Sequence, residues 1–343
     1  MSGDARPGGG GCWGERQDAP PNVKIGICAW ADQALIDDGS FYPKKSMSAE
    51  ARLRYYARFF DTVEINSSYY AIPAARNVAR WAERTPPGFV FNVKAYGLLT
   101  GHNPRPETLP DEVQAMLPAR VPLTHRGEVQ ATALPGTAVE TTFRLFRASL
   151  GPLEDASKLG YVLFQFAPWV RFGSARLADL EALPGRLPGC RIAVEFRDRS
   201  WFPDHADETL AVLRRAGLAH VIVDAPPGGA AVPRVVARTA PSAVFRLHGR
   251  NAVGWARQLR GEEPAVREKY DYLYSDAELR ELRAEVEATA EEGGEVFVSF
   301  NNNNRDYPVR NALTMKRLLG QPAIEAPPAG PGDLFAGGPL VES

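Results

Sequence analysis

The feature of this sequence that most constrains its fold is a series of eight short apolar segments, most of them separated by a stretch of helical character. A short apolar run bounded by turn residues is typical of a buried β-strand. Strands that are apolar along nearly their whole length are buried on both faces, as in a parallel sheet covered by helices. The predicted strands are residues 23–30, 62–67, 89–95, 161–166, 192–197, 220–224, 243–248 and 295–301.

The segments between these strands carry apolar residues at helical spacing. Leu53, Tyr56, Ala57 and Phe60 lie at i, i+3, i+4 and i+7, and similar stripes occur in residues 279–286 and 309–318. Eight strand–helix units predict a single closed (β/α)8 TIM barrel of the α/β class. An open doubly wound sheet usually has a glycine-rich phosphate turn after its first strand. This chain has Cys-Ala-Trp there (28–30).

The predicted barrel domain covers residues 23–320. Residues 1–22 and 321–343 are rich in Gly and Pro and are predicted to be disordered tails. Two segments, 96–142 and 249–294, are longer than a barrel connection needs and follow the third and seventh strands. Loops of this length are usually functional lids or disordered, so we expect them to cover the C-terminal face of the barrel.

Composition narrows the class of protein. The net charge of −1 over 343 residues gives no electrostatic footprint for nucleic acid or an anionic membrane. No apolar run approaches the roughly 20 residues of a membrane span, and the N-terminal residues lack the apolar core of a signal peptide. The three cysteines have neither metal nor redox spacing. These features predict a soluble cytoplasmic protein.

Polar residues gather near the C-terminal ends of the predicted strands, and within a strand they share one face. They are Glu64, Asn66, Asn92, Lys94, Tyr96, Gln165, Glu195, Arg197, Asp224, Arg246, His248 and the run 301–304. Barrel interiors are otherwise filled by branched apolar side chains, and TIM-barrel active sites lie at this end. The pattern therefore predicts an active site. The alternative is an interior ion-pair network in which the acidic and basic side chains satisfy one another.

The charged residues suggest two chemistries. Lys94, Arg197 and Arg246 are cations suited to a phosphate or carboxylate group of a substrate. Glu64 and Glu195 are the candidate acid/base pair, as in glycosidases. Three cations around two carboxylates would, however, lower rather than raise the pKa of an acid.

A metal site is a further alternative. Glu195, Asp224 and His248 come from three consecutive strands and offer oxygen and imidazole ligands that Zn or Mn accept, although the chain has no local metal motif. His248 and Asp224 could instead shuttle protons, and His248 could be structural. A divalent metal therefore stays an open alternative, and the cofactor is unknown.

Neutral residues complete the predicted site. The amides of Asn66, Gln165, Asn301 and Asn302 are suited to orienting the hydroxyl groups of a polar ligand. Trp201 follows a strand end and could form a wall of the pocket, with core packing under a loop as the alternative.

The strand ends also resemble a known family. Residues 63–70 (VEINSSYY), 91–95 (FNVKA), 163–168 (LFQFAP), 193–201 (AVEFRDRSW), 245–251, 270–275 and 300–312 resemble, in order, the YecE-like family, or domain of unknown function 72. The resemblance covers about residues 23–320 and implies a TIM barrel, but it implies no reaction. Its barrel is similar to those of the metal-dependent xylose isomerase and endonuclease IV group. Those enzymes carry an acid on the last strand, where this chain has Asn301.

These observations predict a TIM-barrel enzyme, hydrolase-like or isomerase-like. Its substrate would be an anionic, polyhydroxylated molecule such as a sugar phosphate or a phosphodiester. The alternative is a non-catalytic barrel that binds a metabolite or, ranked lower, a nucleic acid. A scaffold with a relict site is a third reading. No membrane partner is expected, and the oligomeric state is left open.

Overall fold

The computed structural model describes residues 22–228, 232–260, 262 and 268–324, which form one closed parallel barrel. Its strands are β1 (Val23–Cys28), β2 (Thr62–Ile65), β3 (Val90–Lys94), β4 (Leu159–Gln165), β5 (Ile192–Glu195), β6 (Ala219–Asp224), β7 (Ala243–Leu247) and β8 (Val296–Phe300). Each strand pairs with the next, and β8 pairs with β1. The predicted (β/α)8 fold is confirmed, and every strand boundary lies within two residues of its predicted position.

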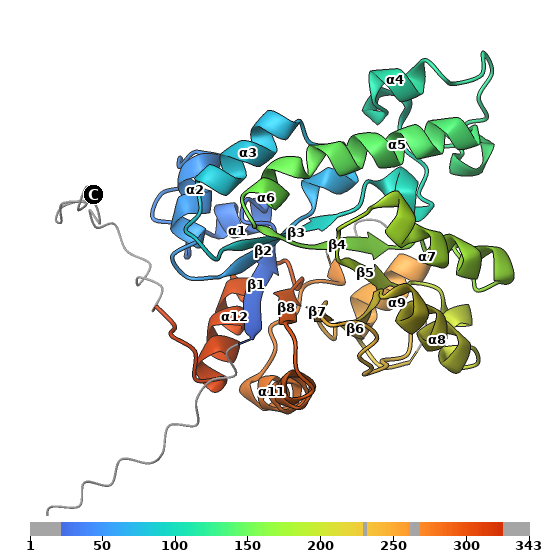
Figure 1. The fold of residues 1–343 in the computed structure, drawn as a ribbon. Helices are drawn as coiled ribbons and strands as arrows, with labels where there is room; N and C mark the ends of the chain where they lie inside the picture. Colours follow the sequence, from blue (N-terminus) through green and yellow to red (C-terminus); the bar gives the residue numbers. More distant parts are fainter. Residues whose placement is uncertain (1–21, 229–231, 261, 263–267, 325–343) are drawn as a thin grey trace, which may run out of the picture.

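Helices surround this barrel (Figure 1). They are α1 (Gln33–Asp38), α2 (Ala49–Tyr56), α3 (Ala75–Glu83), α4 (Asp111–Gln114), α5 (Gly136–Ser149), α6 (Gly151–Asp155), α7 (Ser174–Arg186), α8 (Ala206–Ala216), α9 (Ala252–Leu259), α11 (Asp276–Glu291) and α12 (Tyr307–Leu318). The last helix, α12, packs beside β1, so the two ends of the barrel domain meet.

On the strands from β3 to β8, side chains alternate between two apolar clusters, as the two-residue period of a strand requires. On β5, Ile192 and Val194 belong to the large cluster under the helices, whereas Ala193 belongs to a smaller one. The smaller cluster is the barrel interior; its buried members are Val90, Tyr161, Leu163, Ala193, Ala219, Val221, Val244 and Phe297. The interior is therefore apolar at this level, and the charged side chains lie nearer the C-terminal strand ends.

The two long segments are more ordered than the sequence suggested. The segment after β3 contains the short 3-10 helices η2 (Gly97–Thr100), η3 (Pro106–Thr108) and η4 (Ala131–Ala133), together with α4. It then continues into α5, which begins at Gly136. The segment after β7 contains α9 and α11. The helical stripe at residues 279–286 lies within α11, whereas α9 was not predicted.

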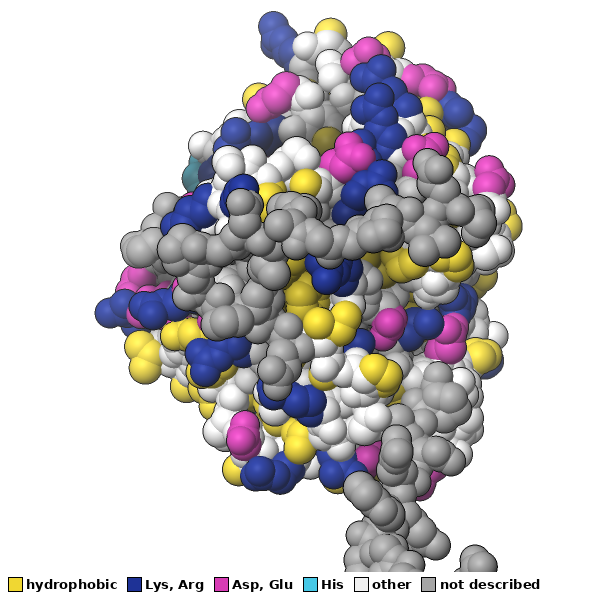
Figure 2. Space-filling view, turned by 90° about the vertical axis from the view of Figure 1, so that its left-hand side faces the viewer, with side chains coloured by type: hydrophobic (Ala, Val, Ile, Leu, Met, Phe, Trp, Pro, Cys, Tyr) yellow, Lys and Arg dark blue, Asp and Glu magenta, His cyan; other side chains and the backbone are white. Residues whose placement is uncertain are grey.

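The two predicted tails lie almost entirely outside the described residues; only Asn22 and residues 321–324 fall within them. None of the helices described is long and apolar enough to cross a membrane. On the face shown in Figure 2, Lys and Arg side chains are interspersed with Asp and Glu, as expected from the near-zero net charge.

Candidate active site

Arg246 on β7 is the centre of a charged network inside the C-terminal end of the barrel. Its Nε and Nη2 donate to the two carboxylate oxygens of Glu64 on β2, at 2.9 and 2.6 Å. Its Nη1 donates to Glu195 on β5 and, at 3.2 Å, to Oε1 of Gln165 on β4. Only 1% of the Arg246 side chain is exposed, and both carboxylates are fully buried. One guanidinium thus joins four strands.

His248 extends this network on the other side of Glu195. Its Nε2 lies 3.2 Å from Glu195 Oε1, and its Nδ1 lies 2.8 Å from Nδ2 of Asn301, the residue that follows β8. Nε2 also lies 3.3 Å from Nη2 of Arg197. The amide nitrogen of Asn301 and the guanidinium of Arg197 can only donate, whereas the Glu195 carboxylate can only accept. Burial lowers the pKa of His248 to about 3, so the imidazole is neutral.

Arg197 binds the same carboxylate from the solvent side. Its Nε lies 2.5 Å from Glu195 Oε1, and 12% of its side chain is exposed. Burial alone would raise the pKa of Glu195, but Arg197, Arg246 and His248 together hold it well below its usual value. Glu195 is therefore a permanent carboxylate and cannot act as a general acid near neutral pH. This is the effect of the surrounding cations that the sequence predicted.

Lys94, the last residue of β3, differs from these paired groups. Its Nζ lies 4.5 Å from the ring centroid of Tyr69, and among the described residues it has no hydrogen-bond acceptor and no ion-pair partner. Burial and then Arg246 lower its pKa to about 8, although Tyr270 and Glu64 oppose this shift. Lys94 is therefore a cation that the protein leaves largely uncompensated.

The segment after β7 brings two further groups that sequence reasoning missed, Lys269 and Tyr270. Lys269 Nζ lies 4.6 Å from the Tyr270 ring centroid and 5.1 Å from that of Trp255. The pKa of Tyr270 is lowered to about 8 by Lys269, Arg197 and Lys94, in that order, although burial opposes the shift. The aromatic run 270–274 was a signal that this segment covers the barrel, but nothing in its spacing placed Tyr270 beside Lys94.

Gly249 lets the chain leave β7 underneath this cover. Its φ of +87° lies in the left-handed region, and a Cβ at this position would lie only 2.6 Å from Cβ of Tyr272. Its N–H donates to the hydroxyl of Tyr274 at 2.8 Å. Both the backbone conformation and the close contact therefore favour glycine immediately after His248.

Asp224 does not join this cluster. It accepts hydrogen bonds from Arg250 (2.8 Å), Arg234 (3.0 Å) and the hydroxyl of Tyr274 (2.7 Å). Because Val221 and Val223 pack in the barrel interior, Asp224 leaves β6 on the opposite face. The prediction that Asp224 lies with Glu195 and His248 is wrong. Its hydrogen bonds with Arg250 and Tyr274 instead hold the segment after β7 against the barrel.

Two other predicted residues also lie away from the mouth. Trp201 is fully buried, and its indole N–H donates to the carbonyl of Val170 at 2.9 Å, so it packs the core under a loop. Asn302 is buried and donates to the carbonyl of Tyr272 and to Asn311. Trp201 and Asn302 thus have protein partners in this structure, and their predicted contact with a substrate stays a prediction.

Asn66 follows β2 and is partly buried. Its side-chain oxygen is buried and has no hydrogen-bond partner among the described residues. Its predicted role in contacting a substrate stays a prediction.

The residues of the mouth do not fit a metal ion. Within the described ranges, no group of three or more His, Cys, Asp and Glu side chains is arranged to hold one. The oxygens of Glu64 and Glu195 receive hydrogen bonds from Arg246, and Glu195 is also bound by Arg197. Both ring nitrogens of His248 have partners as well.

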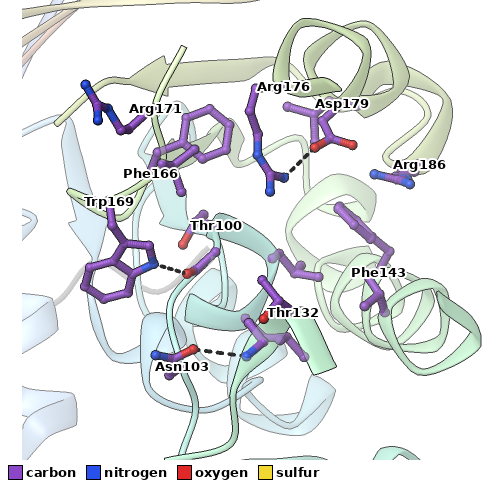
Figure 3. A pocket seen from close by; sticks show the side chains of 17 residues that line it. Thr100, Asn103, Thr132, Phe143, Phe166, Trp169, Arg171, Arg176, Asp179 and Arg186 are labelled. Carbon is purple, nitrogen blue, oxygen red and sulfur yellow. Dashed lines mark hydrogen bonds and ion pairs between the residues drawn. The ribbon is translucent and has the colours of Figure 1, made fainter. Parts of the chain in front are cut away.

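The structure also has a side pocket of about 400 Å³ (Figure 3). It is lined by the segments after β3 and β4 and by α5 and α7, with Phe143 and Phe166 among its apolar residues. Trp169, which is 57% exposed, is held by a 3.0 Å hydrogen bond to the carbonyl of Gly101. Arg176 is paired with Asp179 at 2.7 Å. An apolar wall with charged groups beside it is typical of a small-molecule subsite.

An aromatic strip links this pocket to the mouth. The ring centroids of Trp169 and His102 lie 5.6 Å apart, and those of His102 and Tyr69 lie 5.0 Å apart. Tyr69 is the ring beneath Lys94. The side pocket is therefore close enough to hold a second part of a ligand that occupies the mouth.

Comparisons with known proteins agree with this fold. The family model described as "Protein of unknown function DUF72" matches residues 24–332. The chain is 33% identical over 301 residues to the UPF0759 protein YunF of Bacillus subtilis (strain 168), covering 87% of this chain and 94% of that protein.

Solved structures of two DUF72 family proteins are similar. The one from Enterococcus faecalis V583 has a TM-score of 0.70 and 26% identity, over 89% of this chain and 98% of that chain. The one from Thermotoga maritima MSB8 has a TM-score of 0.64 and 27% identity, over 88% of this chain and 100% of that chain.

Proposed function

This chain belongs to the DUF72 family, whose description names no activity, and we propose that it is an enzyme acting on an anionic, polyhydroxylated substrate at the C-terminal mouth of its barrel. A sugar phosphate is the substrate class that fits best. We further propose an isomerase-like proton transfer rather than a two-carboxylate hydrolysis.

The observation that carries this proposal is the charge balance of the mouth. The carboxylates of Glu64 and Glu195 are matched by the guanidiniums of Arg246 and Arg197. Lys94 has no carboxylate partner within the described part of the chain. Lys269 likewise has no carboxylate partner within the described part of the chain, and its amine packs over the rings of Trp255 and Tyr270. Two partly desolvated cations without counter-charges favour the binding of a phosphate or carboxylate group.

The proton-transfer chemistry follows from which groups titrate near neutral pH. A general acid or base works best when its pKa lies near the working pH. The pKa values of Lys94 and Tyr270 are both about 8, whereas that of Glu195 is held well below its usual value. Lys94 and Tyr270 are therefore better candidates for proton transfer than Glu195 of the predicted pair. The adjacent cations would stabilise negative charge that develops on a substrate oxygen.

The test combines binding with turnover. The purified protein is heated with glucose 6-phosphate, fructose 6-phosphate or inorganic phosphate, and with glucose or fructose as the uncharged controls. We expect a saturable rise in Tm for the phosphorylated compounds alone, reduced in Lys94→Met and Lys269→Met and retained in the exposed-surface control Lys44→Met.

Turnover is measured by NMR in heavy water. An isomerase-like enzyme exchanges the proton next to the substrate carbonyl for deuterium, and this exchange should disappear in Lys94→Met. A ligand that stabilises the wild type but is neither exchanged nor consumed would support the non-catalytic binding barrel instead. Binding of single-stranded DNA or RNA that weakens steeply with salt would favour the nucleic-acid alternative.

A further inference from the structure

We propose that Lys94 is a nucleophile whose ε-amine forms a Schiff base with the carbonyl carbon of a phosphorylated aldose or ketose. This inference rests on the proposed function and names the bond that the site would form. The free amine adds to the carbonyl carbon as the C=O π bond breaks, and one N–H proton passes to the oxygen to give a carbinolamine. A second proton, donated by Tyr270, lets the hydroxyl leave as water while the nitrogen lone pair forms the C=N bond of a protonated imine. Addition of water later reverses these steps and frees the amine.

The first support is the contrast between the half-buried Lys94 and two buried lysines, Lys158 and Lys316. Lys158 Nζ donates to the carbonyl oxygens of Ala82 and Thr85 at 2.6 and 2.5 Å. Lys316 Nζ donates to the carbonyl of Phe59 at 2.9 Å and lies 3.3 Å from Asp61. These two amines are used to hold the structure together.

Lys94 Nζ has no such acceptor among the described residues and instead lies over the face of the Tyr69 ring. The backbone of Lys94 is nevertheless fixed. Its carbonyl accepts a 2.6 Å hydrogen bond from Ser68 Oγ, and Lys94 is paired with Leu163 of the neighbouring strand β4. The amine is thus mounted on a rigid strand end with its donors unused, which is the arrangement a nucleophile needs.

The second support is the set of charges that face this amine from the surrounding elements. They are Glu64 from β2, Arg197 from the segment after β5, Arg246 from β7 and Tyr270 from the segment after β7. Lys269 lies against the Tyr270 ring, and burial and then Lys94 lower the pKa of His102 to about 4. A lysine that is desolvated and lies near other cations is activated as a nucleophile. With a pKa of about 8, roughly a tenth of Lys94 is free amine at pH 7, against roughly 0.03% at the usual value of 10.5.

The neighbours of Lys94 define the substrate class. Arg197 and Lys269 are the cations that would hold a phosphate group beside the reacting carbonyl. Tyr270, whose pKa is also about 8, is the group suited to giving the proton to the carbinolamine oxygen and taking one from the adjacent carbon. This assigns bond formation to Lys94 and proton transfer to Tyr270.

The experiment traps the imine by reduction. The full chain is incubated with pyridoxal 5′-phosphate, an aldehyde that carries a phosphate, and separately with dihydroxyacetone phosphate. Sodium borohydride is added, and adducts are located by peptide mass spectrometry. The chain has only seven lysines, so each one can be followed. We expect one adduct per chain on Lys94, formed up to about 300-fold faster than on exposed lysines such as Lys44 and Lys45, as the ratio of the two free-amine fractions given above predicts.

Matched variants separate the possible outcomes. Lys94→Met should abolish the adduct while retaining the circular dichroism spectrum of the wild type, and Lys44→Met should leave it unchanged. Inorganic phosphate should slow labelling of Lys94 if the anion site is adjacent. Labelling that spreads evenly over surface lysines, or that falls on Lys269 and spares Lys94, would overturn the proposal.

The result also distinguishes this inference from the proposed function. If sugar phosphates stabilise the protein but no reducible adduct forms on Lys94, the proposed anion site is supported and the proposed Schiff base is refuted. A rapid adduct on Lys94 without stabilisation or exchange by any sugar phosphate would support the reactive amine and contradict the sugar-phosphate substrate. As an independent check, the rate of acetylation of Lys94 should rise with pH around an apparent pKa of about 8; a midpoint near 10.5 would refute the activated amine.

Discussion

Replacing Arg246 with methionine is expected to destabilise the barrel through Glu64 rather than through Glu195. Glu64 is fully buried, and Arg246 provides both of its ion-pair hydrogen bonds, whereas Glu195 would keep Arg197 and His248. Removing one partner of a buried ion pair costs about 3–5 kcal/mol, because a desolvated charge is left behind. For a chain of this size that corresponds to a fall in Tm of roughly 6–10 °C.

The loss of stability in Arg246→Met should also depend on pH, in a direction that can be predicted. Without Arg246, the buried Glu64 carboxylate has no guanidinium beside it, and a proton that neutralises it removes the cost of burying that charge. Proton uptake is favoured at low pH, so Arg246→Met should lose less stability at pH 5 than at pH 8. In the wild type, Glu195 acts in the opposite direction: its lowered pKa contributes stability that is lost as pH falls below the usual carboxyl value.

The assay is urea denaturation followed by circular dichroism at both pH values. Adding Glu64→Gln to Arg246→Met should recover about 1–3 kcal/mol, because a neutral amide costs less to bury unpaired than a carboxylate. The matched control is Arg54→Met, whose partner is Glu50 on an exposed helix face; its effect should stay below about 1 kcal/mol. An Arg246→Met variant as stable as that control, or one whose loss grows toward pH 5, would refute this reasoning.

Three further predictions concern residues around the network. The buried His248 imidazole has a pKa of about 3, below the usual value of 6.5, so as pH falls the unfolded chain takes up a proton before the folded protein does. The stability of the fold therefore decreases as pH drops below 6.5. Urea denaturation at pH 5 should show that His248→Gln removes about 2 kcal/mol of this decrease. Asp224→Asn should destabilise the fold by about 2–4 kcal/mol, because Arg250 loses its ion pair. Borohydride trapping at Lys94 should be unchanged in this variant; loss of trapping in a folded variant would show that Asp224 acts in the active site. Trp169→Ala should raise KM roughly tenfold for substrates that reach the side pocket, as expected for one aromatic contact, and leave phosphate binding unaffected; equal effects on both would contradict a separate subsite.

The sequence predicted the mouth well wherever a strand had a clear two-residue pattern. On β5, Ala193, Glu195 and Arg197 share one face, so identifying Ala193 as interior was enough to place the two charged groups. On β6 both faces are apolar, and Asp224 was assigned to the interior without such a pattern. Its true orientation depends on how β6 is set against β5 and β7, which is a tertiary property.

The sequence alone therefore determined the (β/α)8 barrel and most of the side chains that enter its C-terminal end, because hydrophobic alternation and strand parity are local. Only the tertiary structure decided which of those side chains form ion pairs and hydrogen bonds with one another. Arg246 reaches Glu64 across 182 positions of sequence, so its pairing depends on barrel closure. The same closure brings Tyr270 near Lys94, and the pKa values of these two groups follow from distance and burial, which no local pattern contains.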